Sequence, residues 1–293
     1  MPPIEVLVVG VIGEDSGKTV LSTSITGVAR SIGIRAAVFK PYAATSVWVH
    51  PEILGEVRRR RLVVSSDSIR YLAVAPEVHP EISNPVAILL GPRDPSANMW
   101  RPLPLPSSET VELGVLGRVS MCRDERVDTL HFVNMDALSR LPQTVQDVLV
   151  DAAAALKPHP LRSGRSLVES IVSGSHDRAP LSCYERLRAE YELLVIESNS
   201  DVPIPLGGIR PSIVVVAGPG VMGIVNGARY MRSLEVLGLA GARGLSGARV
   251  EDVIRLSGVQ ETVPLPFLED SDELYRREDL APLIEKIVTL LAR

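Results

Sequence analysis

The sequence predicts an α/β fold with three layers, in which helices cover both faces of a mostly parallel β-sheet. Short apolar runs alternate along the whole chain with segments whose apolar residues recur at helical spacing. Residues 6–9, 191–197 and 213–217 have the composition of buried parallel strands. Because apolar strands alternate with helical segments through the whole chain, the strands can be joined by crossovers and lie mostly parallel in one sheet.

The composition is that of a globular chain without a membrane span. At 293 residues the chain is long enough for a full core, and apolar residues make up 45% of it. No apolar run approaches the ~20 residues that a spanning helix needs, and no basic and apolar leader segment opens the chain. A net charge of -4 and only 4% aromatic residues argue against a general nucleic-acid surface. We therefore expect a cytoplasmic protein with no membrane or nucleic-acid partner.

The two cysteines give no sign of a special site. Cys122 and Cys183 lie far apart in the sequence, and neither has a paired Cys or His at the spacing of metal ligands. This pattern argues against a zinc site and against a disulfide framework. Both are therefore interpreted as packing residues.

The loop after the first strand predicts a phosphate-binding site. The apolar run of residues 6–9 breaks into a loop that ends Gly17-Lys18-Thr19, and a helical pattern follows over residues 20–32. In this context the backbone N–H groups of residues 13–18 can converge on polyphosphate oxygens, at a helix N-terminus with partial positive charge. Lys18 would reach the β- and γ-phosphates, and Thr19 would coordinate Mg²⁺.

The residues assigned to nucleotide binding are Gly13, Glu14, Asp15, Ser16, Gly17, Lys18 and Thr19. The loop departs from the usual motif at one place. Its consensus has a glycine six residues before the lysine, where this chain has Ile12.

A second lysine follows the next predicted strand. Gly33 ends the first helix, residues 34–39 read as a strand, and Lys40-Pro41 comes directly after it. Ligands of open α/β sheets collect at the carboxyl ends of the strands. Lys40 is therefore placed where it can meet a phosphate or a carboxylate that lies over the phosphate loop.

The order of these motifs resembles that of dethiobiotin synthetase. The Gly-Lys-Thr loop, its helix and a strand running into Phe39-Lys40-Pro41 are followed by a Ser-Asp motif at residues 65–68, and then by Asn84-Pro85 and a proline-rich turn. By this resemblance Asp67 takes the place of a magnesium-ligating aspartate. Lys40 takes that of the lysine near the γ-phosphate and the substrate carbamate. Both roles suit the chemistry, because Mg²⁺ prefers oxygen ligands and a cation stabilises a transferred phosphoryl group.

A second stretch carries the same resemblance. The predicted strand at residues 191–197 ends in Glu197, and a Pro-Leu pair follows at residues 205–206, as in dethiobiotin synthetase and the related amidotransferases. Glu197 resembles the second metal carboxylate of that family, and an acid beside the phosphate loop can hold Mg²⁺ directly or through water. Where the family has a glycine-rich turn, this chain has Ser198-Asn199-Ser200, whose side chains would occupy the space in which the backbone approaches the substrate.

Residues 98–160 have no counterpart in the family and are interpreted as an insertion. Two alternating stretches, residues 111–121 and 127–134, read as a hairpin, and residues 141–156 read as a helix. The insertion could be a lid, a dimer arm or a partner site. Residues 1–97 and 161–293 would then form the P-loop NTPase domain.

The rest of the chain completes the sheet. A helix is expected from residue 224 after the strand at 213–217, and a weaker strand is expected at residues 237–245. Residues 263–267 read as a short closing strand, and residues 280–291 as an amphipathic helix.

The resemblance implies an enzyme of the ligase type that uses ATP and Mg²⁺ to phosphorylate a carboxylate or carbamate, which an amine then attacks. Lys18 and Lys40 would be catalytic, and Thr19, Asp67 and Glu197 would be the metal ligands. The expected partners are a small carboxylate or amine substrate and a second copy of the chain in a homodimer. The alternative is a regulatory or assembly ATPase that acts through dimer rearrangement, as in other branches of the superfamily. Those relatives carry an extra lysine early in the loop, where this chain has Gly13 and Glu14, so the enzyme is favoured.

Overall fold

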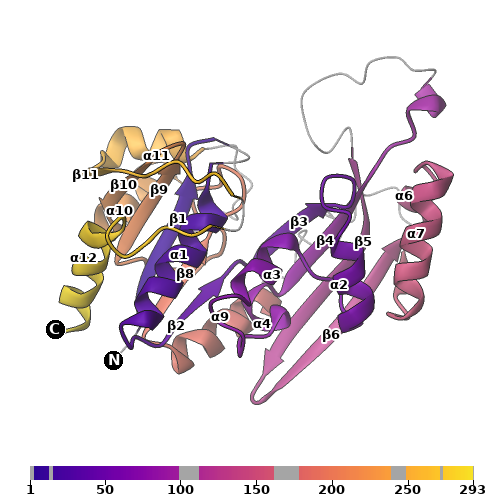
Figure 1. Ribbon diagram of the computed structural model, residues 1–293, viewed down its shortest axis with the longest axis horizontal. Coiled ribbons are helices and arrows are strands. Elements are labelled where there is room, and N and C mark those ends of the chain that lie inside the picture. The colour runs from indigo at the N-terminus through magenta and orange to yellow at the C-terminus, as the bar shows by residue number, and fades with distance from the viewer. Residues whose placement is uncertain are drawn as a thin grey trace. The chain divides into compact units, whose positions relative to one another are not determined.

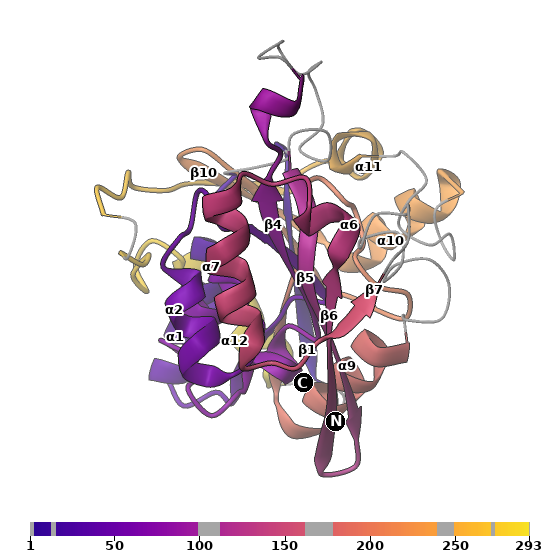
Figure 2. The ribbon, with the colours of Figure 1, turned by 90° about the vertical axis from the view of Figure 1, so that its right-hand side faces the viewer.

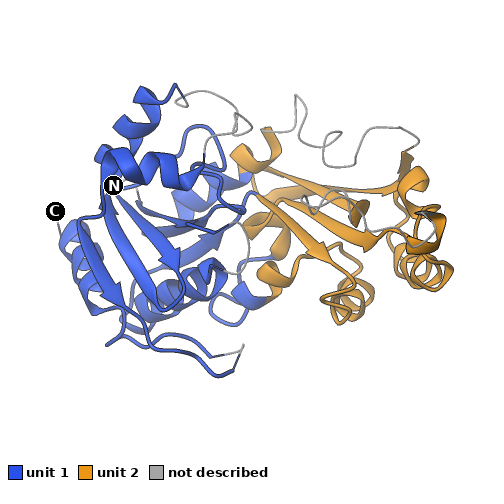
Figure 3. Cartoon of the chain, turned by 90° about the horizontal axis from the view of Figure 1, so that it is seen from above, with its two compact units in different colours: residues 1–41, 70–79, 183–293 blue, residues 42–69, 80–182 orange. Residues whose placement is uncertain are grey.

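The chain forms two compact units, each with its own β-sheet. The computed structural model describes residues 3–12, 16–98, 112–161, 178–238, 249–270 and 273–292. The first unit comprises residues 1–41, 70–79 and 183–293, and the second comprises residues 42–69 and 80–182 (Figure 3). Helices and strands alternate in both units, which confirms the α/β fold class.

The first unit is built on a six-stranded, mostly parallel sheet (Figure 1). Its strands in spatial order are β11 (Glu261–Pro264), β10 (Val221–Asn226), β9 (Ile213–Gly218), β1 (Ile4–Gly10), β8 (Leu193–Glu197) and β2 (Ala36–Phe39). β9, β1, β8 and β2 run parallel, whereas β10 runs antiparallel to both of its neighbours, β9 and β11. Val8 pairs with Glu197, and Phe39 pairs with Ile196, so β1, β8 and β2 end at one edge of the sheet.

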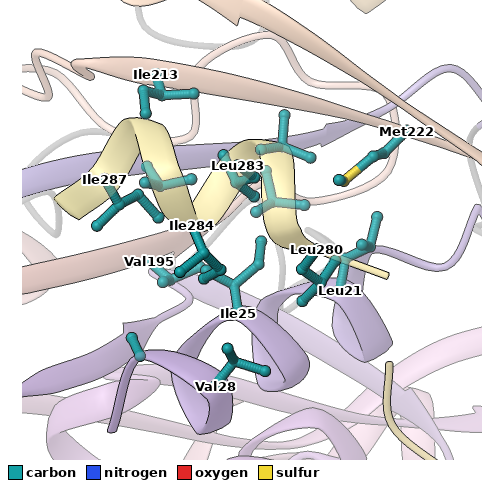
Figure 4. Close-up of a cluster of buried hydrophobic side chains, with 14 of the residues drawn as sticks. Leu21, Ile25, Val28, Val195, Ile213, Met222, Leu280, Leu283, Ile284 and Ile287 are labelled. Carbon is teal, nitrogen blue, oxygen red and sulfur yellow. The ribbon is translucent and has the colours of Figure 1, made fainter. Parts of the chain in front are cut away.

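Helices cover both faces of this sheet. On one face, Leu21 and Ile25 of α1 (Lys18–Ser31) pack with Leu283 and Ile287 of α12 (Ala281–Leu291) against Val195 of β8 (Figure 4). The other face carries the part of α9 (Arg178–Glu190) that begins at residue 183, as the contacts of Glu5 show below. Two further helices of this unit, in contact with each other, are α10 (Gly227–Val236) and α11 (Val250–Ser257).

A buried carboxylate joins α9 to the amino end of β1. Glu5 points to the face opposite Val6, because side chains alternate along a strand. The Tyr184 hydroxyl donates to Glu5 Oε1 at 2.7 Å, the Arg210 backbone N–H donates to Oε2 at 2.9 Å, and Arg188 Nε lies 2.8 Å from Oε1. Burial and the bond to Glu5 raise the pKa of the Tyr184 phenol above its ordinary value. Glu5 thus has protein partners on both carboxylate oxygens.

The second unit has a five-stranded mixed sheet. Its strands in spatial order are β3 (Tyr42–Ser46), β4 (Val86–Pro92), β5 (Glu112–Arg123), β6 (Arg126–Asn134) and β7 (His159–Leu161). Its apolar core includes residues of three helices, α2 (Ile53–Arg60), α6 (Met135–Leu138) and α7 (Gln143–Ala154), which pack on the sheet (Figure 2). The remaining short elements are α3 (Ser66–Tyr71), whose last two residues belong to the first unit, α4 (Pro80–Ser83) and the 3₁₀ turn η1 (Pro95–Asn98).

The hairpin and helix expected between residues 98 and 160 are confirmed as β5, β6 and α7. Strand β5 pairs with β4, which in turn pairs with β3. The second unit is therefore larger than the expected insertion, because two strands that precede residue 98 share its sheet.

Arg118 of β5 is fully buried and connects this sheet to two loops. Its guanidinium donates to the carbonyl oxygens of Val63 at 2.6 Å and Asn84 at 2.6 Å, and to Ser120 Oγ at 2.7 Å. Burial lowers the pKa of Arg118 to about 10, against the opposing effect of Glu81, so the side chain stays charged at neutral pH. His131 on the paired strand accepts a hydrogen bond from the Val63 N–H at 3.3 Å.

Two expectations are corrected. Residues 224–226, where a helix was expected to begin, are the end of strand β10 (Val221–Asn226), because the chain turns back through Pro219 and Gly220, where Gly220 has a φ of 69°. Cys122 and Cys183 are both disulfide-bonded and are therefore not merely packing residues. The strand expected at 237–245 lies mostly outside the described residues, and Leu237 itself caps the end of α10. Among the residues described, no helix has the length and apolarity to cross a bilayer.

His131 predicts a pH dependence of stability. Burial, and then the charge of Arg118, lower the pKa of His131 from 6.5 to about 4. Between these two values the unfolded chain binds a proton that the folded chain does not, so the free energy of unfolding should fall as the pH drops from about 6.5 towards 4. Urea unfolding of His131→Gln should show a weaker slope in this window. His159→Gln, at an exposed position of β7, is the control and should keep the wild-type slope.

Candidate functional site

The start of α1 presents a lysine beside a tight turn. Gly17 precedes the helix with a φ of 83°, a left-handed conformation that glycine adopts without steric cost, and its carbonyl accepts the Leu21 N–H at 3.0 Å. Gly17 has no side chain that could cap the first amides of the helix. Lys18 is buried, and its Nζ donates to Ser16 Oγ at 3.0 Å. The ammonium group is thereby held at the helix N-terminus, where an anion would be favoured.

Gly10 leaves the space that these side chains need. A Cβ placed on this last residue of β1 would lie 2.2 Å from Ser16 Oγ and 2.8 Å from Lys18 Nζ. Both distances are far shorter than a carbon atom tolerates. A glycine at this position is therefore a condition for the observed place of Lys18.

Three side chains converge on Glu197, the last residue of β8. Its carboxylate is completely buried. Lys40 Nζ and Thr19 Oγ1 each donate to Oε1 at 2.8 Å, and the Tyr71 hydroxyl donates to Oε2 at 2.8 Å. A buried charge is stabilised only when it is paired and hydrogen-bonded, and Glu197 has an ammonium group and two hydroxyls for this purpose.

The strand register explains why these residues meet. Lys40 follows β2, Glu197 ends β8, and Thr19 lies in the first turn of the helix after β1. These three strands are neighbours in the parallel sheet, so their carboxyl ends lie side by side. Tyr71, the last residue of α3, completes the group from a separate segment of the first unit.

The structure brings together some of the predicted site residues. Lys18 and Ser16 are in contact, and Thr19, Lys40 and Glu197 form one hydrogen-bonded cluster. Asp67 lies in the first turn of α3, in the part assigned to the second unit, and its proximity to Glu197 stays a prediction. The predicted loop residues 13–15 lie outside the described residues.

In the turn after Glu197 the Ser198 side chain lies inside the loop, and the expectation that the turn's side chains occupy the ligand space stays a prediction for Asn199 and Ser200. The Ser198 hydroxyl is turned into the loop and donates to the Val202 carbonyl, and its N–H donates to the Val8 carbonyl at 3.0 Å. Ser200 has a φ of 46°, the left-handed conformation for which glycine is usual. The serines therefore reproduce part of the backbone course of a glycine-rich turn, with the hydroxyl of Ser198 buried.

Two residues of the site were missed in the sequence. Gly10 is detectable in principle, because it stands where an apolar strand breaks into the loop. Tyr71 carries no local signal, since it lies 126 positions before the residue it contacts.

The oxygen atoms at this site fit Mg²⁺ bound by one hydroxyl and one carboxylate, with phosphate and water as its other ligands. Thr19 and Glu197 supply two oxygen ligands of the kind that Mg²⁺ prefers, on side chains already 2.8 Å apart. Within the described ranges, no three or more His, Cys, Asp or Glu side chains gather as a metal site. A metal here would depend on oxygens of a bound ligand, as is usual for Mg²⁺ in nucleotide sites. The buried Lys18 and the glycine-dependent turn fit the polyphosphate.

Neither a known family model nor a curated protein matches the chain. The resemblance to dethiobiotin synthetase therefore depends on the short motifs quoted above. What the site can do must follow from its own geometry.

The ion pair of Lys40 and Glu197 predicts a large stability effect in the absence of any ligand. Lys40→Met removes the ammonium group from a fully buried carboxylate, which should destabilise the fold by about 3–5 kcal/mol. The double variant Lys40→Met/Glu197→Gln removes both charges and should recover most of this loss. Urea unfolding of the single and double variants measures both values. An equal loss in both would show that the pair is not coupled.

Gly10 predicts a defect in nucleotide binding that exceeds its defect in stability. In Gly10→Ala the new methyl group displaces the side chains of Ser16 and Lys18, so ATP affinity should fall by at least about tenfold, or ~1.4 kcal/mol. Gly207→Ala, which has open space around its Cβ, is the matched control and should keep wild-type affinity. Calorimetric titration with ATP and thermal unfolding of both variants give the comparison.

Proposed function

We propose that the protein is a Mg²⁺- and ATP-dependent enzyme of the ligase type, which phosphorylates a carboxylate or carbamate for attack by an amine. The observation that supports this most strongly is the convergence of Thr19 and Lys40 on one oxygen of the buried Glu197. It brings a hydroxyl, a cation and a carboxylate to the carboxyl edge of the sheet, next to a lysine at a helix N-terminus. Polyphosphate, metal and an acidic acceptor each find a complementary group there.

Each side chain has a defined part in this proposal. Lys18 and the first amides of α1 bind the β- and γ-phosphates, and Ser16 keeps the ammonium group in place. Thr19 and Glu197, with Asp67 as a further candidate, hold Mg²⁺. When bound, Mg²⁺-ATP would supply the phosphoryl group, and the metal would neutralise part of the charge on its oxygens.

Lys40 is the residue that distinguishes a ligase from a simple nucleotide-binding protein. Its ammonium group is buried at the carboxyl end of β2 and donates to Glu197 Oε1 at 2.8 Å. There it can attract an acidic acceptor and stabilise the charge that grows during phosphoryl transfer. The proposed acceptor is a small carboxylate or carbamate together with an amine, and the proposed assembly is a cytoplasmic homodimer.

The test is ATP turnover with a set of acceptors. Wild-type protein is incubated with Mg²⁺-ATP, bicarbonate and a pool of diamino and ω-amino acids, and phosphate release is measured. One or more acceptors should stimulate release. Lys18→Ala should abolish both nucleotide binding and release while it stays folded, because the lysine acts on the ligand phosphates.

Two results would contradict the proposal. Unchanged Mg²⁺-ATP affinity in a folded Lys18→Ala protein would remove the phosphate-loop assignment. Stimulation by a protein partner or a membrane, with no response to any amine or acid, would instead favour a regulatory or assembly ATPase.

A further inference from the structure

Tyr71 binds the candidate metal ligand Glu197 through the carboxylate oxygen that Thr19 and Lys40 do not use. Its hydroxyl donates to Glu197 Oε2, whereas Thr19 and Lys40 both donate to Oε1. Tyr71 is itself buried, and it comes from a segment, residues 70–79, that contributes none of the nucleotide-binding residues. The carboxylate is thus held from two directions by groups with different tasks.

A bound ligand would affect the donors on the two carboxylate oxygens differently. Under the proposed function, Thr19 and Lys40 are needed elsewhere, because the threonine oxygen binds the metal and the lysine binds phosphate or acceptor. Oε1 is then left open to the metal. The Tyr71 phenol has no ligand-binding role in the proposed function, so its hydrogen bond to Oε2 would persist when a ligand binds. A carboxylate oxygen so deeply buried needs a donor at all times.

From this geometry we infer that Tyr71 is a positioning residue, which holds Glu197 by Oε2 so that Oε1 faces Thr19 and the metal. The inference rests on the proposed function. Outer hydrogen bonds of this kind fix the orientation of a metal ligand, and their removal typically lowers metal affinity about 10- to 100-fold. Tyr71 would not touch the metal, the nucleotide or the acceptor.

The first unit contains a matched control. Tyr184 also donates to a buried glutamate, Glu5, at 2.7 Å, but at the amino end of β1, the edge of the parallel sheet opposite Glu197. Tyr184→Phe and Tyr71→Phe each remove one hydroxyl that serves a buried carboxylate. Both changes should lower stability, and only Tyr71→Phe should alter the response to Mg²⁺.

The experiment measures ATP affinity by calorimetry with excess EDTA and over a range of Mg²⁺ concentrations. In wild-type protein Mg²⁺ should strengthen binding. In Tyr71→Phe the Mg²⁺ concentration needed for half of this gain should rise about 10- to 100-fold, while the affinity in EDTA stays within about threefold. Tyr184→Phe should match wild type in both conditions.

A double variant tests whether Tyr71 acts through Glu197. In the Glu197→Gln background, Tyr71→Phe should cause no further change in the Mg²⁺ response, since its target is already altered. A wild-type Mg²⁺ response in Tyr71→Phe, or an equal further loss in the double variant, would overturn the positioning role and leave the proposed function standing. Absence of Mg²⁺-dependent ATP binding in the wild type would instead reject the proposed function and this inference together.

Thermal unfolding covers the case in which Tyr71→Phe does not fold. Lys40→Met/Tyr71→Phe/Glu197→Gln removes the buried carboxylate together with the ammonium group that would otherwise lose its counter-charge, so this variant should then be folded, which would support the coupling of Tyr71 to Glu197. An unfolded triple variant, beside a folded Lys40→Met/Glu197→Gln, would make Tyr71 a packing residue and overturn the inference.

Discussion

The ion pair between Lys40 and the buried Glu197 is the interaction on which the candidate site depends. A carboxylate at the end of a central strand cannot be hydrated there, so it must be neutralised and hydrogen-bonded by its neighbours. The sheet meets this demand with Lys40, directly after β2, the strand next to β8. Thr19 in the first turn of α1 and Tyr71 from outside the sheet supply the other two donors.

The first unit contains a second buried carboxylate that clarifies the role of the first. Glu5 is bound by a phenol, an arginine and a backbone amide, and none of these groups faces the phosphate loop. Arginine keeps its charge and a fixed fork of donors, which suits a permanent structural contact. Glu197 is hydrogen-bonded instead by a lysine and a threonine, whose side chains would also bind phosphate and metal under the proposed function. On that proposal, one sheet holds a structural carboxylate at the amino end of β1 and a carboxylate with exchangeable donors at the carboxyl end of β8.

Local patterns predicted most of the first unit and the centre of the site. Apolar runs and the Gly-Lys-Thr loop were sufficient to predict β1, α1, β8 and β9. The predicted strand ends also placed Lys40 and Glu197 together at the carboxyl ends of the parallel strands. The failures came from information outside local sequence. Residues 221–226 are apolar enough for either a strand or a helix, and the turn at Gly220 decided between them. Tyr71 could not be predicted, because nothing near it in the sequence records which carboxylate it meets. No strand was expected at residues 42–46, which form β3 beside β4, because a five-residue segment with threonine and serine gives no clear strand pattern without knowledge of its partner.

Arg118 imposes a condition on how the second unit can assemble. The guanidinium is fully enclosed, and it takes carbonyl oxygens from the loop at Val63 and from Asn84, two segments separated in sequence from β5. A partly folded form that contained the sheet without these loops would carry a desolvated charge, and loops formed without the sheet would bury carbonyls with no donor. Both partly folded forms would therefore be destabilised relative to the complete unit. We expect the sheet and both loops to open together, so that opening of the chain around Val63 would expose Arg118 and loosen the neighbouring strands as one unit.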